Sequence, residues 1–345
     1  SLAERLVEIT PGTFEKKVFF DNSRSEAVET ALKLSRWHTR KQLFLSFTGA
    51  FHGYTFGALS LSARSLDEKR YFFPLLTGVI HIPYPYCYRC FLKQSHPECR
   101  YACVDFIEDI VLGKQVSPED VAALVFEPIQ WEGCIVPPPE YFNRLKKLAD
   151  KYGFLLIDDE SYTGVGRAGK WFAIEHWNIV PDILCSANSL ASGLPLAVTV
   201  AEAKLMDWVE GSHMSSFGGN PLSCVAALAV IDTIKEERLL ENAVKQGSYI
   251  LKRLRELKDE CEIVGDVRGK GLMIGMEIVK GEEETPSYED TREIVIRAWK
   301  RGVVVSPCNS SAIILTPPLN ISRDLVDDAI DIVCDVVKEV EAEGK

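Results

Sequence analysis

The 345-residue chain lacks the features that mark membrane and secreted proteins. No apolar run approaches the length that crosses a bilayer, and the amphipathic start SLAERLVEIT differs from the apolar core of a signal peptide. Internal repeats and low-complexity linkers are also missing. The sequence therefore predicts a cytoplasmic globular protein that does not enter a membrane.

Positive charge is scarce as well. Lys and Arg number 39 and Asp and Glu number 50, which gives a formal net charge of −11. Because contacts with a phosphate backbone need a basic surface, this balance argues against a nucleic-acid-binding protein. The length allows two domains, or one large domain with a smaller lobe.

The ten cysteines fall into two groups. Four of them form the spacing Cys87-x2-Cys90-x8-Cys99-x3-Cys103, with His96 between the pairs. This spacing could hold a structural zinc ion. The alternative is a cysteine-rich surface excursion, reduced or disulfide-bridged, because the intervening loop is shorter than in the common zinc modules. The others stand in apolar surroundings and are interpreted as small buried residues: Cys134, Cys185, Cys224, Cys261, Cys308 and Cys334.

Short apolar runs alternate with segments of helical periodicity. The predicted strands are KKVFF, QLFLSF, GVIHIP, AALVFEP, FLLIDDE and DILCSA. Helical periodicity is clear in SEAVETALKLSRWHTR and in one long segment from Pro221 to Lys258. Apolar strands that alternate with helices predict a mostly parallel sheet covered on both faces. After about Leu257 the pattern changes. We therefore predict an α/β fold with a large domain over residues 1–235 and a smaller C-terminal α/β lobe over residues 236–345.

Polar residues at the strand ends are the candidates for a site, because an open parallel sheet binds ligands beyond the carboxyl ends of its strands. The run FLLIDDE ends in Asp158, Asp159 and Glu160, and the strand in VFEPIQWEG ends at Glu127, which could instead only cap a turn. A carboxylate buried there needs a cationic partner, such as a metal, an arginine or a protonated ring nitrogen. Ser23 and Ser25 lie at the start of the helix that follows KKVFF. They could cradle a phosphate or only cap the helix.

Eight motifs follow one another along the chain: NSRSEAVETALK, GAFHGYTFGALSLS, FEPIQWEG, LLIDDESYTGVGRAGKWFAIEH, PDILCSANSLASGLPLA, SSFGGNP, VRGKGLMIGMEI and LTPPLNIS. Together, from about Leu2 to Lys338, they resemble the class III aminotransferases, whose fold is pyridoxal-phosphate fold type I. The resemblance implies pyridoxal 5′-phosphate as cofactor. It also implies transfer of an amino group from an amino acid or ω-amine to a 2-oxo acid. Relatives have further residues before LAERLVEI, so we expect that N-terminal segment of the family to be absent here.

The resemblance also implies roles for single residues around the cofactor. Asp159 matches the aspartate that pairs with the pyridinium nitrogen, where a protonated ring is the stronger electron sink. Phe51 matches the aromatic residue stacked on the ring, and His52 follows it as in the family. Ser23 and Ser25 lie in the turn that holds the phosphate.

Two further residues match positions on the substrate and partner sides of such a site. Ser216 matches a serine or threonine that reaches the phosphate from the partner subunit, which implies a homodimer. Glu132 lies in the segment near the substrate.

The chain departs from the family pattern at several of these positions. Asn188 occupies the place of the lysine that forms the Schiff base and shuttles the proton, and asparagine can do neither. Arg24 replaces the glycine of the phosphate turn, where it could bind phosphate itself or occupy the site. Tyr162 replaces a glutamine that bonds the ring, although its hydroxyl could substitute. Trp131 replaces a glycine, and Ile314 stands where many members have a carboxylate-binding arginine.

These departures leave three hypotheses. The chain could be a lysine-deficient form of an aminotransferase, or a non-catalytic homologue, natural or redesigned, that serves as a binding or structural protein. The third is a new reaction in the old pocket, with Tyr162, His52 or Glu132 as acid or base. In each case we expect little or no transaminase activity from the chain as written.

Overall fold

The computed structural model describes residues 1–308 and 311–344, and the chain forms two compact units. The first unit contains residues 1–128, 137–165 and 171–233, and the second contains residues 129–136, 166–170 and 234–345. The predicted boundary after residue 235 lies next to the last of these junctions. However, two short segments of the predicted first domain belong to the second unit. Hydrogen bonds hold them there: Leu272 N donates to Arg167 O at 2.9 Å, and Arg268 Nε donates to Gly133 O at 2.9 Å.

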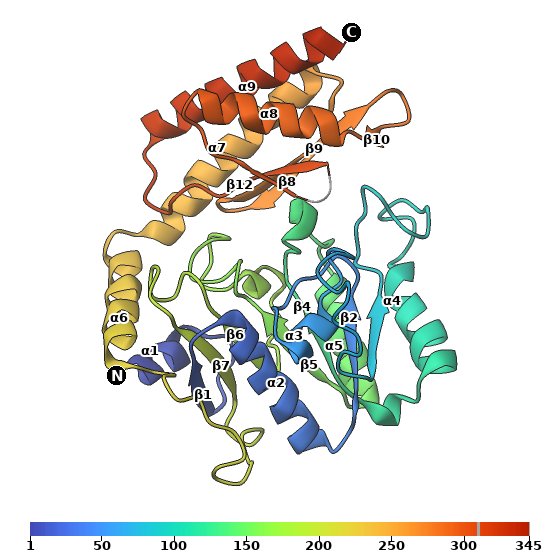
Figure 1. Ribbon diagram of the computed structural model, residues 1–345, viewed down its shortest axis with the longest axis vertical. Coiled ribbons are helices and arrows are strands. Elements are labelled where there is room, and N and C mark those ends of the chain that lie inside the picture. The colour runs from blue at the N-terminus through green and yellow to red at the C-terminus, as the bar shows by residue number, and fades with distance from the viewer. Residues whose placement is uncertain (309–310, 345) are drawn as a thin grey trace. The chain divides into compact units, whose positions relative to one another are not determined.

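The first unit is built on a seven-stranded sheet with the strand order β1-β7-β6-β5-β4-β2-β3 (Figure 1). Strands β3, β2, β4, β5 and β6 are parallel to one another, whereas β7 is antiparallel to both β6 and β1. The sheet is therefore mostly parallel, which confirms the predicted fold class. The strands are β1 Lys16–Asp21, β2 Leu43–Phe47, β3 Val79–Ile82, β4 Val121–Phe126, β5 Leu155–Asp159, β6 Ile183–Ser186 and β7 Ala197–Glu202.

Helices cover both faces of this sheet. The helices of the first unit are α1 Leu2–Ile9, α2 Arg24–Thr39, α3 Phe56–Leu61, α4 Ala102–Phe106, α5 Tyr141–Tyr152 and α6 Pro221–Glu236, with a π-helix Ile107–Gln115 and short 3-10 turns Pro118–Asp120 and Ala173–Trp177. On one face α2 buries Ala27 and Val28 in the same core as Val125 of β4. On the other face Phe142 of α5 stacks on Phe126 of β4, with ring centroids 4.7 Å apart. Burial on both faces explains why β4 is apolar throughout.

Two elements differ from the sequence prediction. The strand β7 was not among the predicted strands, although all of it except Glu202 is buried. The long helical segment from Pro221 is broken into α6 and α7, because Arg238 adopts a left-handed conformation with φ of 52° between them. Within the described residues, no helix is both long and apolar enough to cross a membrane.

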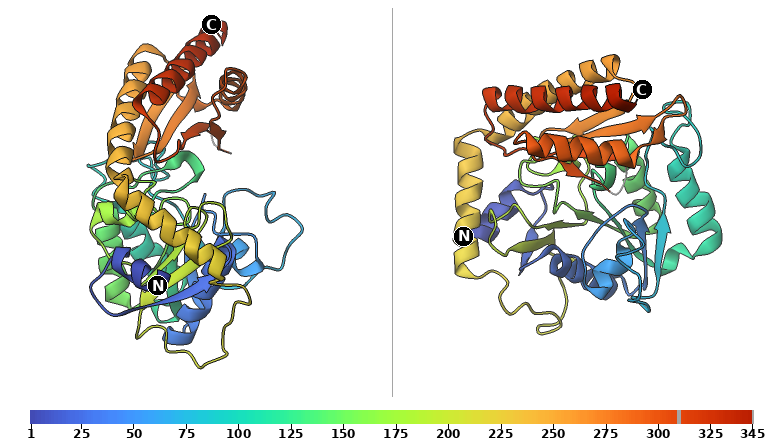
Figure 2. Two further views of the ribbon diagram at one scale, coloured as in Figure 1. Left: turned by 90° about the vertical axis from the view of Figure 1, so that its left-hand side faces the viewer. Right: turned by 45° about the horizontal axis from the view of Figure 1, so that its top comes forward.

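The second unit packs helices against a small antiparallel sheet (Figure 2). Its elements are α7 Leu239–Glu260, β8 Val264–Lys270, β9 Met273–Lys280, β10 Thr285–Pro286, α8 Tyr288–Lys300, β11 Ser306–Pro307, β12 Ala312–Leu315 and α9 Arg323–Gly344, with the 3-10 turn Glu132–Cys134. Ile314, which the resemblance matches to the family's arginine, is 1% exposed and pairs with Gly275 of β9. It is therefore a core residue of this sheet.

Gly247 of α7 lies directly against the backbone of Gly271. A Cβ added at Gly247 would lie 1.9 Å from the Gly271 carbonyl oxygen, which leaves no room for alanine. We expect Gly247→Ala to lower the free energy of unfolding by about 1–3 kcal/mol despite the higher helix propensity of alanine. Chemical denaturation checks this, with the exposed neighbour Ser248 as the control site. Equal stabilities of Gly247→Ala and Ser248→Ala would contradict the steric argument.

Candidate active site

The predicted site residues meet at the carboxyl end of the sheet in the first unit. Asp159 is the last residue of β5, and Glu127 follows directly after β4. Phe51 and His52 lie in the loop that follows β2, and Arg24 begins α2. The sequence analysis predicted a site among the polar residues at the strand ends, because the carboxyl ends of parallel strands lie at the same edge of the sheet. The structure brings these five side chains into one hydrogen-bonded and stacked cluster.

Asp159 is fully enclosed by donors. Its Oδ2 accepts from Arg24 Nε at 2.8 Å and from His52 Nδ1 at 2.8 Å, and its Oδ1 accepts from the Ser161 backbone N at 3.1 Å and hydroxyl at 2.6 Å. Burial alone would raise the pKa of this carboxyl, but the charge of Arg24 and the His52 hydrogen bond outweigh it and hold the pKa at about 2. Asp159 is therefore an ionised, paired carboxylate, and the arginine is the cationic partner that the sequence left open.

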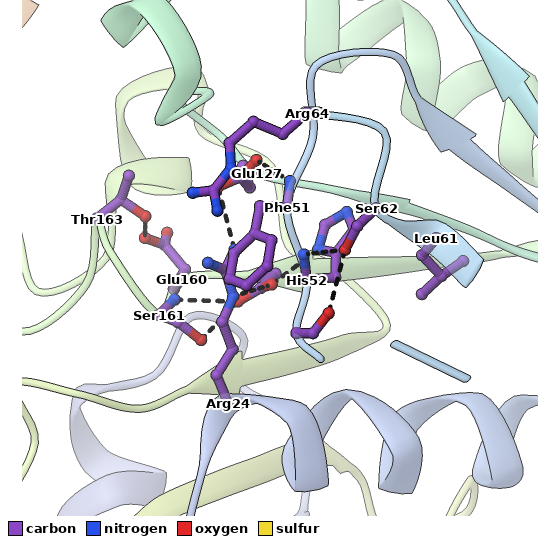
Figure 3. Close-up of polar contacts among 12 residues, drawn as sticks. Arg24, Phe51, His52, Leu61, Ser62, Arg64, Glu127, Glu160, Ser161 and Thr163 are labelled. Carbon is purple, nitrogen blue, oxygen red and sulfur yellow. Dashed lines mark hydrogen bonds and ion pairs between the residues drawn. The ribbon is translucent and has the colours of Figure 1, made fainter. Parts of the chain in front are cut away.

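Arg24 is buried, with 6% of its side chain exposed. Its guanidinium carbon lies 5.0 Å from the ring centroid of Phe51 and 4.6 Å from that of Tyr162. Its Nη2 donates to Glu127 Oε1 at 3.0 Å, and burial raises the pKa of Glu127 above its usual value. Figure 3 shows Arg24 extending from the start of its helix toward Glu127 and Phe51. Arg24 is thus the centre of the cluster rather than part of an open phosphate turn.

The start of α2 is capped by its own residues. Ser23 Oγ accepts from Glu26 N at 3.3 Å, and Asn22 N donates to Glu26 Oε2 at 3.0 Å. The hydroxyl of Ser25 accepts from Tyr54 N at 3.0 Å. Of the two interpretations for this turn, helix capping is the one whose contacts are present. A phosphate-binding role for Ser23 and Ser25 stays a prediction.

The remaining predicted residues lie outside this cluster. Asn188 follows β6 in a turn, is exposed and has φ of 56°, a conformation that asparagine tolerates better than most residues. Ser216 is exposed in the segment between β7 and α6. Glu132 lies in the turn Glu132–Cys134 of the second unit. Their roles stay predictions.

The four spaced cysteines line one pocket together with His96. Nevertheless, within residues 1–308 and 311–344 no group of three or more His, Cys, Asp or Glu side chains could hold a metal ion. Cys87, Cys90, Cys99 and Cys103 are also free of disulfides. Burial and the neighbouring thiols raise the pKa of Cys103 to about 12, which disfavours the thiolate that zinc binds. The geometry gives the predicted zinc site no support, and its reduced alternative fits the free thiols.

Sequence reasoning missed two members of the cluster. Arg64 lies 4.2 Å from the Phe51 centroid and pairs with Glu68, and no motif in the sequence pointed to it. Ser161 supplies two donors to Asp159. Its position two residues after the strand-ending aspartate was a signal, because an aspartate side chain commonly accepts a hydrogen bond from the backbone N–H two residues further on.

Comparisons with known proteins give the same family as the motifs. Residues 1–337 match the family described as Aminotransferase class-III. The chain belongs to the class III aminotransferase family. It is 41% identical over 347 residues to a leucine/methionine racemase of Thermococcus litoralis, covering 100% of this chain and 77% of the relative. It is 39% identical over 340 residues to a 4-aminobutyrate aminotransferase of Mycobacterium leprae, covering 96% and 75% of the two chains.

Solved transaminase structures share this fold. An amine transaminase from an uncultivated Pseudomonas species, in its pyridoxal-phosphate-bound form, matches with a TM-score of 0.89 and 33% sequence identity over 98% of this chain and 80% of that chain. A chain described as a transaminase with L-alanine matches with a TM-score of 0.92 and 28% identity over 100% and 85% of the two chains. Pyridoxal phosphate is therefore the cofactor that the family implies.

The residues of this chain do not fit that cofactor. Asp159 is the residue that would pair with the ring nitrogen, and Arg24, His52 and Ser161 already satisfy it. The Phe51 ring, which the resemblance assigns to stacking on the cofactor, is in contact with the Arg24 guanidinium. The motif resemblance predicts that Asn188 stands at the position of the family's lysine. No reaction step through pyridoxal phosphate follows from this arrangement.

Proposed function

We propose that this chain is a catalytically deficient member of the class III aminotransferase family. It keeps the fold of enzymes that transfer an amino group from an amino acid or ω-amine to a 2-oxo acid, but serves without that reaction as a binding or structural protein. The observation that carries this proposal is the buried ion pair of Arg24 with Asp159, at 2.8 Å. Asn188 supports it, because an amide is neither an imine-forming amine nor a base.

The ion pair favours a non-catalytic homologue over a lysine-deficient enzyme. Loss of the lysine alone would leave the contacts around the ring unchanged, whereas here Arg24 and Tyr162 also occupy the cluster. The hypothesis of a new reaction in the same pocket has less support than that of a non-catalytic homologue. His52 is 0% exposed, so a substrate could reach it only after the cluster opened.

A homodimer is part of this proposal. Met214 and Phe217, on either side of Ser216, are 80% and 76% exposed. Large apolar side chains gathered in one exposed segment are typical of a surface that a partner covers. We also propose a cytoplasmic location from the composition of the chain.

The proposal predicts that the protein has no transaminase turnover. Purified protein incubated with pyridoxal phosphate, amine donors and 2-oxo acids should form no product above a protein-free control. Borohydride reduction should leave no cofactor attached to the chain, as mass spectrometry would show. Formation of transaminase product by the unaltered protein would refute the proposal.

The variant Asn188→Lys separates the two explanations. We expect it to stay inactive, because the added amine does not free Asp159 from Arg24. Recovered turnover in this single variant would instead mean that the rest of the pocket is intact, and that the chain is a lysine-deficient enzyme.

A further inference from the structure

The carboxylate of Asp159 has no lone pair left to accept a hydrogen bond from a further donor. A carboxylate offers about four lone-pair sites. All of them are used here, two by Arg24 Nε and His52 Nδ1 and two by the backbone and hydroxyl of Ser161. A ring nitrogen could bond to this carboxylate only after one of these donors had moved. Arg24 is the donor that stands where the related motif has glycine, so it is the one that this chain has added.

The Arg24 guanidinium also takes an aromatic stacking position. It is planar and cationic, and it lies against Phe51 and Tyr162 with centroid distances of 5.0 and 4.6 Å. A planar cation that donates to Asp159 and stacks on Phe51 is also what the family resemblance implies for a protonated pyridine ring. Arg24 makes these contacts from within the chain.

The Arg24 cation already faces both acidic side chains of the cluster. Arg24 faces the ionised Asp159 and lies 3.0 Å from Glu127, whose other oxygen accepts from Phe51 N at 3.2 Å. Both acidic side chains are 2% exposed or less. A second cation introduced beside Asp159 would compete with Arg24 for one buried carboxylate, which is costly because neither charge could be resolvated there.

We propose that Arg24 is an internal ligand that takes the place of the cofactor ring and closes the pocket to pyridoxal phosphate. This inference rests on the proposed function and goes beyond it. It assigns the exclusion of the cofactor to one side chain. The missing lysine removes only the covalent link, whereas Arg24 occupies the non-covalent contacts.

Equilibrium dialysis with pyridoxal 5′-phosphate tests the proposal on the full chain. Compared with the unaltered protein, Arg24→Gly should bind the cofactor at least about tenfold more tightly, since it restores both the acceptor and the space beside Phe51. Asn188→Lys should show no such gain in affinity for the cofactor, because Arg24 is still present in that variant. Saturating cofactor should raise the Tm of Arg24→Gly and leave that of the unaltered protein unchanged, because only a bound ligand stabilises the fold.

Arg64 provides the matched control. It contacts the same ring, with its guanidinium 4.2 Å from the Phe51 centroid, but it pairs with Glu68 rather than Asp159. Arg64→Ala should therefore gain no affinity for the cofactor. If Arg24→Gly is insoluble, Arg24→Met removes the guanidinium but keeps most of its volume, and it should show the same direction of change.

Three results would overturn the proposal: cofactor binding by the unaltered protein as tight as by Arg24→Gly, an equal gain in Arg64→Ala, or no gain in either Arg24 variant. These are distinct from failure of the proposed function. Cofactor binding without turnover in the unaltered protein would refute only the role of Arg24. Turnover by the unaltered protein would refute the proposed function.

Discussion

Replacing Arg24 with alanine is expected to lower the free energy of unfolding by roughly 3–5 kcal/mol, the usual cost of removing one partner from a buried ion pair. The variant leaves Asp159 and Glu127 buried without the cation that both contact. It also removes the group packed between Phe51 and Tyr162. Urea unfolding of the two proteins at neutral pH measures the difference. Values within about 0.5 kcal/mol of each other, which is the usual effect of a surface substitution, would refute the argument.

A double-mutant cycle shows whether the loss comes from the ion pair. Asp159→Asn alone should also destabilise the protein, because it removes one of the two carboxylates that face the buried Arg24 and leaves the cation with Glu127 alone. If the pair accounts for the effect, the double variant should be less destabilised than the sum of the two single variants by about 0.5–3 kcal/mol. Strict additivity would assign the effect of Arg24 to packing against the rings instead.

Raising the pH from about 4.5 to 7 is expected to reduce stability through Glu160. Burial raises the pKa of this carboxyl from 4.5 to about 7, although its oxygens accept from Thr163 Oγ1 and from Ile174 N at 2.8 Å. In this pH range the folded protein keeps the proton and the unfolded chain releases it. The unfolded state then binds fewer protons, so stability falls as pH rises, by at most about 1.4 kcal/mol per pH unit and about 3 kcal/mol in all.

The variant Glu160→Gln isolates this contribution. The amide oxygen can still accept from Ile174 N, but the side chain no longer titrates, so stability should depend less steeply on pH between 4.5 and 7. Asp158 acts in the same direction, because burial and the neighbouring Glu160 raise its pKa as well. Asp159 does not contribute in this range, since its pKa of about 2 places its effect at lower pH. An unchanged slope in unfolding free energy from pH 4.5 to 7 would refute the assignment to Glu160.

Most of the fold could be predicted because its signals are local. The apolar runs that became β1 to β6 and the periodicity of α2 depend on residues close together in the chain. The antiparallel strand β7 was missed since its pairing with β1 and β6 is a long-range choice. The two short segments that joined the second unit were missed for a related reason. Their place depends on hydrogen bonds such as that from Arg268 to Gly133 O, 135 residues apart in the chain.

The sequence by itself determined the family and the strand-end position of Asp159, and it predicts the replacement of the lysine by Asn188. These features depend only on the order of residues along the chain, so they can be identified without a structure. What only the tertiary structure decided is where the side chain of Arg24 goes. A long, flexible cation at a helix start could reach solvent, a phosphate or a buried acid with equal ease. Only the packing of Phe51, Tyr162, Glu127 and Asp159 around one point fixes its position, because those residues come from three segments that are distant in the chain.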